Sequence, residues 1–358
     1  MTKRYFYSLD GIRGLAAALV VLRHTPAFFG PVSFQESYLA VDIFFVLSGV
    51  VLANAYESRL QSTLSVARFM WIRLARLYPL YILGTAITVF AVLLGITDGT
   101  KYDHLPALVV LALLMLPNVI QIGSGVLYPL NNPAWSLFFE LVANAAYATI
   151  ARRLTAKMLS LILALSAIGL MISLYIASAH SMDMGGAPRK IPVGLVRVGY
   201  SFFAGIACYR IFTARARRPL DAGRHVPALI GVLCVIAIIL MSAPSSSVQP
   251  YFDFLCVTAV FPVITYLALW IEPVGIAAQI CKVWGTISYA LYALHAPVGY
   301  LVQGWAKAKF GLAVEIYAPE IGASFLVLLM AACWIADTIY DWPFRRLLLR
   351  VAAKPRSE

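Results

Sequence analysis

Eleven long apolar segments constrain this chain more than any other feature of its sequence. Each is about 20 residues long, the length that an α-helix needs to cross a hydrocarbon core of about 30 Å. In lipid, backbone N–H and C=O groups must be satisfied within the segment, which a helix achieves and an isolated strand does not. The sequence therefore predicts an all-α, polytopic transmembrane helix bundle. The segments are 9–29, 38–56, 77–96, 105–122, 135–151, 158–179, 192–212, 226–243, 252–271, 283–303 and 317–338.

The basic residues at both ends of the chain predict its topology. Lys3 and Arg4 precede the first segment, and a run of lysines and arginines follows the last. Short basic stretches stay on the cytoplasmic side of a membrane. We therefore expect both termini to be cytoplasmic and the number of crossings to be even, about ten. One segment between residues 77 and 151 is then re-entrant or interfacial, and we favour 105–122, which has a proline near each end.

The balance of charge indicates the surroundings of the protein. The chain carries 28 lysines and arginines and a net charge of +12, which taken alone could indicate a nucleic-acid partner. Most of these residues lie in short loops beside apolar segments, which is the topology signal of a membrane protein. We therefore expect a multi-pass protein of the plasma (inner) membrane, with membrane lipid as a partner and no nucleic acid. A transmembrane domain is expected at 1–345 and a basic cytoplasmic tail at 346–358.

Several patterns speak against other classes of protein. Asp10 and Arg13 enter the first segment early and no small-residue cleavage site follows it, so we expect this segment to be retained. The five cysteines are odd in number and scattered, and they predict buried free thiols with neither a disulfide framework nor a metal site. The sequence has no Walker A loop, no G-x-S-x-G elbow and no H-E-x-x-H helix, which disfavours ATP-driven transport, serine hydrolysis and zinc proteolysis.

The first segment has a polar face. An ionisable side chain at the centre of a bilayer costs about 2.5–3.5 kcal/mol to insert, so each one requires a reason. At about 100° per residue, Asp10, Arg13 and His24 fall on one side of a helix, with His24 about 16 Å beyond Arg13. A helix buried in a bundle would explain one such residue, with Arg13 paired to Asp10 and His24 bonded to a carbonyl. Three on one face favour a polar cavity.

Asp42 opens the second segment, on the side of the membrane where the first one ends. In a two-helix hairpin it lies at a depth similar to that of His24. Its carboxylate could hold the imidazole in one tautomer and stabilise the protonated form, as the orienting member of a catalytic triad does. A helix cap explains an aspartate at this position equally well.

Arg73 and Arg76 lie on one face of a helix at the predicted inner surface, three residues apart. With Arg13 they form a basic cluster suited to the oxygens of phosphate groups. Basic residues also gather on this side for topological reasons alone. Because Arg13 lies within its segment, a bound anion competes with that explanation.

Polar residues also mark two later segments. Ser136 and Glu140 lie four residues apart on one face. A glutamate within a membrane indicates a functional site, or else an ion pair with an arginine such as Arg197. Trp135 is expected to anchor the interface between membrane and water. His295 is a second cavity candidate, or else a histidine satisfied within the packing.

Six stretches carry a resemblance to a known family. They are SLDGIRGLAA at 8–17, Arg23-His24, VDIFFVLSG at 41–49, RLARLYPLY at 73–81, WSLFFE at 135–140 and ISYALYALH at 287–295. Together they resemble acyltransferase family 3, the integral membrane O-acyltransferases that act on carbohydrates. The resemblance covers the length of the chain. It implies about ten transmembrane helices, an acyl-CoA donor bound from the cytoplasm and an acceptor sugar on the far side, in a stand-alone transferase.

The resemblance also gives the polar residues expected roles. His24 is the expected general base, oriented by Asp42, and an acyl-histidine intermediate is equally open. The phosphates of acyl-CoA, with acetyl as the expected acyl group, would be held by Arg13, Arg73 and Arg76. The residues expected to line the cavity or position the acceptor are Asp10, Trp135, Ser136, Glu140 and His295.

Two other functions remain open. A transporter or flippase of an anionic lipid-linked sugar would also need a polar cavity and inner arginines. A sensor or assembly subunit would use the same helices only to hold partners. The motif set favours the enzyme, and it leaves the acceptor and the oligomeric state open.

Overall fold

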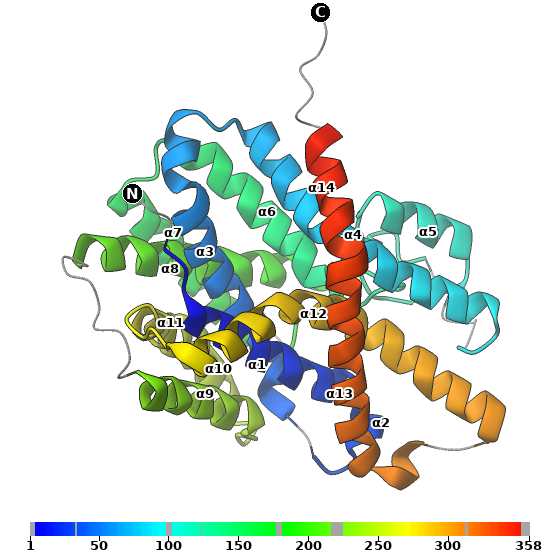
Figure 1. Ribbon diagram of the computed structural model, residues 1–358. Helices are drawn as coiled ribbons and strands as arrows, with labels where there is room; N and C mark the ends of the chain where they lie inside the picture. The colour runs from blue at the N-terminus through cyan, green and yellow to red at the C-terminus, as the bar shows by residue number, and fades with distance from the viewer. Residues whose placement is uncertain are drawn as a thin grey trace, which may run out of the picture.

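The computed structural model describes residues 4–32, 34–97, 102–122, 124–176, 181–215, 225–311 and 314–351. Every regular element within these ranges is a helix, and none of the described residues forms a strand (Figure 1). Each of the eleven predicted segments overlaps one helix or a run of consecutive helical pieces, although in 105–122 only Leu105–Leu113 is helical. The prediction of an all-α fold is confirmed.

The first half of the chain supplies the elements that form most of the site. Ser65 caps one of them, α4, through its Oγ atom, which accepts a hydrogen bond from the backbone N–H of Arg68 at 3.3 Å. The elements are α1 (Tyr7–His24), α2 (Pro26–Phe29), η1 (Gln35–Leu39), α3 (Ala40–Ser62), α4 (Val66–Leu93), α5 (Leu105–Leu113) and α6 (Ala134–Ile150).

The second half contributes one very long helix, α12, which ends where Gly311 takes up a left-handed conformation with φ of 62°. Two stretches, η4 and η6, are π-helical and join neighbouring helices without a loop. The elements are α7 (Ala156–Ile176), η3 (Pro188–Lys190), α8 (Ile191–Arg215), α9 (Val226–Met241), α10 (Gln249–Leu255), η4 (Cys256–Val260), α11 (Phe261–Ala268), α12 (Gly275–Phe310), η5 (Val314–Tyr317), α13 (Glu320–Ile335), η6 (Ala336–Asp341) and α14 (Trp342–Val351).

Six helical stretches among the described residues are long and apolar enough to cross a membrane. They indicate a multi-pass membrane protein, as the sequence predicted. Helix α5 has nine residues and a length of about 14 Å, which is too short for a crossing. This agrees with the expectation that 105–122 is not a full span, while ten crossings and cytoplasmic termini stay predictions. The six stretches are Gln35–Ser62, Val66–Leu93, Ala156–Ile176, Pro188–Arg215, Gln249–Ala268 and Glu320–Arg350.

Close helix crossings fix the two helix pairs on which the site depends. Helix α1 packs along α12, where a Cβ atom added at Gly14 would lie 2.5 Å from Trp284. Helix α3 crosses α8 at a pair of glycines, because a Cβ atom at Gly49 or at Gly205 would lie 2.0 Å from a carbonyl oxygen of the facing helix. Small residues allow such backbone contact between membrane helices.

Helical structure extends further toward the C-terminus than the sequence indicated. Helix α14 continues from α13 through η6, and the indole N–H of Trp71 donates to the backbone oxygen of Leu348 at 3.0 Å. The described part of the predicted tail, 346–351, is therefore a helix that contacts α4, while 352–358 lies outside the described residues.

The five cysteines are all free, as expected, and four of them are buried. Cys234 is exposed on α9, which corrects the expectation that every thiol is buried.

Candidate active site

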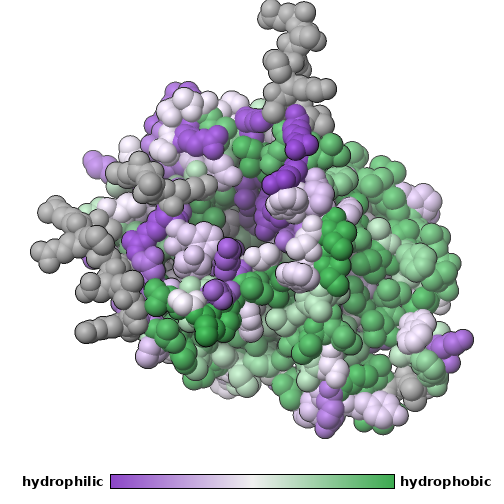
Figure 2. Space-filling view, in the orientation of Figure 1, coloured by the Kyte–Doolittle hydropathy of each residue, from purple (hydrophilic) through white to green (hydrophobic). Residues whose placement is uncertain are grey.

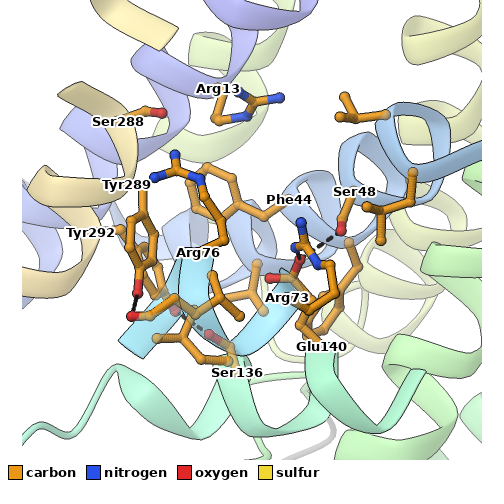
Figure 3. Close-up of a pocket in the computed structure, with 16 residues that line it drawn as sticks. Arg13, Phe44, Ser48, Arg73, Arg76, Ser136, Glu140, Ser288, Tyr289 and Tyr292 are labelled. Carbon is orange, nitrogen blue, oxygen red and sulfur yellow. Dashed lines mark hydrogen bonds and ion pairs between the residues drawn. The ribbon is translucent and has the colours of Figure 1, made fainter. Parts of the chain in front are cut away.

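A central pocket lies where helices α1, α3, α4, α6 and α12 converge (Figure 3). It encloses about 800 Å³, including the part that opens to solvent. Phe44 and Phe45 of α3 form an apolar part of its wall, together with Leu77 of α4 and Leu137 of α6. The polar lining residues are Arg13, Ser48, Arg73, Arg76, Ser136, Glu140, Ser288, Tyr289 and Tyr292.

A second and wider cavity, the arginine mouth, opens beside α14. It has a volume of about 1530 Å³ and shares Arg13, Arg73 and Arg76 with the central pocket. Figure 2 shows hydrophilic side chains gathered in a hollow at this position. Its charged and aromatic lining residues are Arg4, Tyr5, Phe6, Asp10, Arg13, Tyr56, Arg73, Arg76, Trp342, Arg345 and Arg346.

A third cavity, the histidine cavity, lies at the other end of α1. It has a volume of about 1270 Å³ and shares Val41 and Tyr292 with the central pocket. Three adjoining cavities therefore follow α1 from Arg13 to His24, over about 16 Å of helix. The histidine cavity is lined on its polar side by Arg23, His24, Ser37, Tyr38, Asn132, Trp135, Asp183 and Lys190.

The three predicted arginines meet at one place, and each has one carboxylate partner. Arg13 pairs with Asp10 at 3.0 Å, as one of the sequence interpretations expected. Arg76 pairs with Asp341 at 3.3 Å, and Arg73 with Glu140 at 2.7 Å. A guanidinium has five N–H donors, so one ion pair leaves donors available. The buried Nε of Arg73 has no partner among the described residues. The cluster thus retains hydrogen-bonding capacity for an anionic ligand.

Glu140 belongs to the arginine cluster and does not pair with Arg197. Its carboxylate accepts from Arg73 at 2.7 Å and from the Ser48 hydroxyl at 2.6 Å. The alternative that Glu140 pairs with an arginine is confirmed, but the partner is Arg73 and not Arg197, which another carboxylate engages. Ser48 was missed as a site residue, although it lies in the conspicuous run at 41–49.

Asp42 is engaged by Arg197 and not by His24. The two side chains are fully buried and form an ion pair at 2.5 Å, and the Ser201 hydroxyl donates to the same carboxylate at 3.3 Å. The N-cap of α3 is Leu39, so Asp42 does not cap the helix either. Both expected contacts of this aspartate are corrected. The close crossing of α3 and α8 brings the pair together, and a buried guanidinium requires a carboxylate partner.

Arg197 also fastens the wall of the histidine cavity. Its remaining donors reach the backbone oxygens of Met182 at 2.7 Å, Met184 at 2.6 Å and Tyr38 at 3.2 Å. Tyr38 and Met184 line the cavity. The Arg197–Asp42 pair therefore acts as a structural support and explains why an arginine is tolerated within α8.

Trp135 lines the histidine cavity, whereas its neighbour Ser136 lines the central pocket. Trp135 is half-buried in the wall of the histidine cavity, where a Cβ atom at Gly185, with φ of 135°, would come within 2.4 Å of its ring. The structure thus places Trp135 in the cavity wall. Ser136 is buried and lies 2.6 Å from the hydroxyl of Tyr292, which separates the two cavities.

His24 and His295 are brought together from helices that are distant in the sequence. His24 is half-buried in the histidine cavity, and its ring centroid lies 5.1 Å from that of the fully buried His295. The Nδ1 atom of His295 lies 3.0 Å from the backbone oxygen of Leu291 and 2.9 Å from that of Tyr292. No described residue forms a hydrogen bond with the His24 ring, so its nitrogens remain available to a ligand.

A model of a protein family described as "Acyltransferase domain" matches residues 6–338, a range that includes every predicted site residue. The chain belongs to acyltransferase family 3. This confirms the resemblance drawn from the sequence motifs and makes the protein an O-acyltransferase by family.

Two curated proteins are similar to this chain. Protein 2 in the picA locus of Rhizobium radiobacter is 45% identical over 183 residues, which are 47% of this chain and 94% of that protein. Peptidoglycan O-acetyltransferase OatA of Listeria monocytogenes serovar 1/2a is 24% identical over 317 residues, which are 83% of this chain and 50% of OatA. The chain thus spans about half the length of OatA. No solved structure gives a significant match.

Proposed function

We propose that this family 3 acyltransferase moves an acetyl group from acetyl-CoA to a hydroxyl of an extracytoplasmic or lipid-linked carbohydrate. The observation that carries the proposal is the series of adjoining cavities along α1, with arginines at one end and a histidine at the other. In the proposed topology, with about ten crossings in the inner membrane and cytoplasmic termini, the arginine mouth faces the cytoplasm. Donor and acceptor then approach from opposite sides.

The arginine mouth suits the phosphates of coenzyme A. Arg13, Arg73 and Arg76 come from two helices and line one continuous space. Guanidinium groups bind phosphate oxygens through paired, charge-assisted hydrogen bonds. The thioester arm would extend from there through the central pocket, whose apolar wall of Phe44 and Phe45 suits the uncharged pantetheine chain.

The histidine cavity supplies the chemistry in this proposal. A ring nitrogen of His24 takes the proton of the acceptor hydroxyl while the hydroxyl oxygen attacks the thioester carbonyl carbon. The new C–O bond forms and the C–S bond breaks. The thiolate leaves with the electron pair and receives the proton from His24, so the products are the acetyl ester and coenzyme A.

The acceptor is proposed to lie against the polar wall of the histidine cavity. Trp135 and Tyr38 offer aromatic faces there, while Asp183 and Lys190 offer polar groups for sugar hydroxyls. The name of the relative from Listeria, a peptidoglycan O-acetyltransferase, supports acetyl as the group and a carbohydrate as the acceptor.

The main alternative, a flippase of an anionic lipid-linked sugar, can be separated from the enzyme by turnover. Purified protein in detergent would be supplied with acetyl-CoA carrying a labelled acetyl group and with oligosaccharide acceptors. Release of coenzyme A together with label on the acceptor supports the proposal. If neither product forms, although a thermal unfolding transition shows that the protein is folded, the proposal is refuted.

A further inference from the structure

The fully buried His295 has a tautomer that its neighbours define. Its Nδ1 atom lies at hydrogen-bonding distance from two backbone carbonyl oxygens, those of Leu291 and Tyr292. Carbonyl oxygens only accept hydrogen bonds, so Nδ1 must carry a proton. In the neutral ring the other nitrogen, Nε2, is then an acceptor with a free lone pair.

The Nε2 atom of His295 is buried and has no partner among the described residues. Buried polar atoms are nearly always hydrogen-bonded, so an orphaned acceptor in a helix core indicates a missing donor. Two polar aromatic rings lie against the imidazole. The Tyr292 hydroxyl is engaged by Ser136 and by the backbone oxygen of Pro133. The other ring is His24, whose nitrogens have no described partner.

The two imidazoles stand at the separation that a direct hydrogen bond requires. Their centroids are 5.1 Å apart and their planes are inclined by 64°. An N–H···N bond spans about 2.9 Å, and each ring adds about 1 Å between nitrogen and centroid. The separation of the two rings therefore permits an N–H···N bond from His24 to the Nε2 of His295 after a reorientation of the half-buried His24 ring.

We propose that His295 is the positioning residue of His24. Its Nε2 atom accepts the N–H of His24, which directs the other ring nitrogen of His24, with its lone pair, into the histidine cavity. His295 thus takes the orienting part that the sequence assigned to Asp42, which is held by Arg197. The inference rests on the proposed function, in which His24 is the base.

The packing of α12 against α1 holds the rings of His295 and His24 next to each other. Helix α12 packs along α1, and a Cβ atom at Gly299 would lie 2.6 Å from the side chain of Thr25, the residue after His24. One turn before Gly299, His295 is fixed to its own helix through Nδ1. Positioning groups are effective when such contacts lock their own orientation.

Two substitutions test the roles of the two ring nitrogens of His295 separately. In His295→Asn the amide keeps a donor near the Nδ1 position and loses the acceptor near Nε2. In His295→Gln the amide oxygen can restore that acceptor. We expect His295→Asn to lower kcat by about 10²-fold, with the KM for acetyl-CoA unchanged, and His295→Gln to recover most of the rate. Wild-type rates in His295→Asn, the reverse order, or equal losses in both variants would overturn the proposal.

A second measurement does not depend on turnover. The chain has five histidines, so ¹⁵N-histidine labelling gives a spectrum in which each ring can be assigned by substitution. We expect His24 in the wild type to populate one neutral tautomer and to lose that preference in His295→Asn. The exposed His104, changed to Asn, serves as the control. An unchanged His24 tautomer in His295→Asn would overturn the pairing, whereas a paired His24 without acetyl transfer would refute only the proposed function.

Discussion

The two ends of the route differ in how their functional side chains are held. At the arginine mouth, Arg13, Arg73 and Arg76 each have one carboxylate partner and keep 12–31% of their side chains exposed. At the histidine cavity, both side chains of the supporting pair, Arg197 and Asp42, are fully buried.

This difference suits two tasks. Partly exposed arginines with spare donors can accept phosphate oxygens without losing all their existing partners. A wall fixed by buried ion pairs keeps a base in one place, which proton transfer requires. Changes at the mouth should therefore alter the KM for the donor, and changes at His24 should alter kcat.

The largest effect is expected for His24→Ala. Loss of a general base lowers kcat by about 10²–10⁴-fold, and the KM for acetyl-CoA should stay near its wild-type value because the arginine mouth is untouched. Steady-state release of coenzyme A measures both constants. His104→Asn, on the exposed surface, is the control. A raised KM for acetyl-CoA with an unchanged kcat would mean that His24 contributes to donor binding and not to proton transfer.

The next largest effect is expected on stability, from Asp42→Asn. This change leaves the charge of Arg197 buried without a carboxylate, which costs about 3–5 kcal/mol in the free energy of unfolding. Tryptophan fluorescence during thermal unfolding in detergent follows the loss. Because the side-chain oxygen of asparagine still accepts a hydrogen bond from Arg197, the wall keeps its position and the kcat of the protein that remains folded should be close to that of the wild type.

Asp183→Asn provides a matched control for this change. Asp183 also pairs with an arginine at the histidine cavity, but its side chain is 55% exposed, so its loss should cost only about 0–1 kcal/mol. If Asp42→Asn were as stable as the wild type and inactive, the aspartate would have a catalytic role after all.

Local patterns in the sequence predicted the arginine end well. Spacing by three residues places Arg73 and Arg76 on one helix face, and topology rules place Arg13 near them. The eleven apolar segments all overlap helices for the same reason, since apolar length is a local property, although the second half of 105–122 is not helical. The helix ends were less predictable: α12 begins at Gly275 and not at 283, because polar residues such as Lys282 still continue a helix.

The histidine end depends on contacts that no local pattern contains. The sequence pointed to polar residues that line or support the cavities, but its pairing of Asp42 with His24 and its alternative pairing of Glu140 with Arg197 differ from the ion pairs of the structure. Which carboxylate meets Arg197 is decided by the crossing of α3 and α8 at Gly49 and Gly205. The approach of His295 to His24 likewise requires α12 to lie along α1.

A smaller effect is expected at the arginine mouth from Arg73→Lys. Lysine keeps the charge that pairs with Glu140 and loses the planar fork that binds phosphate, so the KM for acetyl-CoA should rise about tenfold, the equivalent of about 1.4 kcal/mol. The same kinetics with acetyl-pantetheine, which lacks the nucleotide phosphates, should show no such increase. Arg153→Lys, at an exposed position outside the cavities, is the control. An equal penalty with both donors would exclude phosphate binding by Arg73.

The smallest effect is expected at the acceptor side, from Lys190→Ala. Lys190 lines the histidine cavity, whereas its neighbour Arg189 is exposed outside it, so Arg189→Ala removes the same charge from the same short helix as a control. A partly exposed charge contributes about 0.2–1 kcal/mol, so the KM for a lipid-diphosphate-linked acceptor should rise by a few-fold and less at high salt. The KM for a neutral oligosaccharide should not change. If both variants raised the KM for the anionic acceptor equally, the attraction would come from the general field of the surface and the cavity would have no part in it.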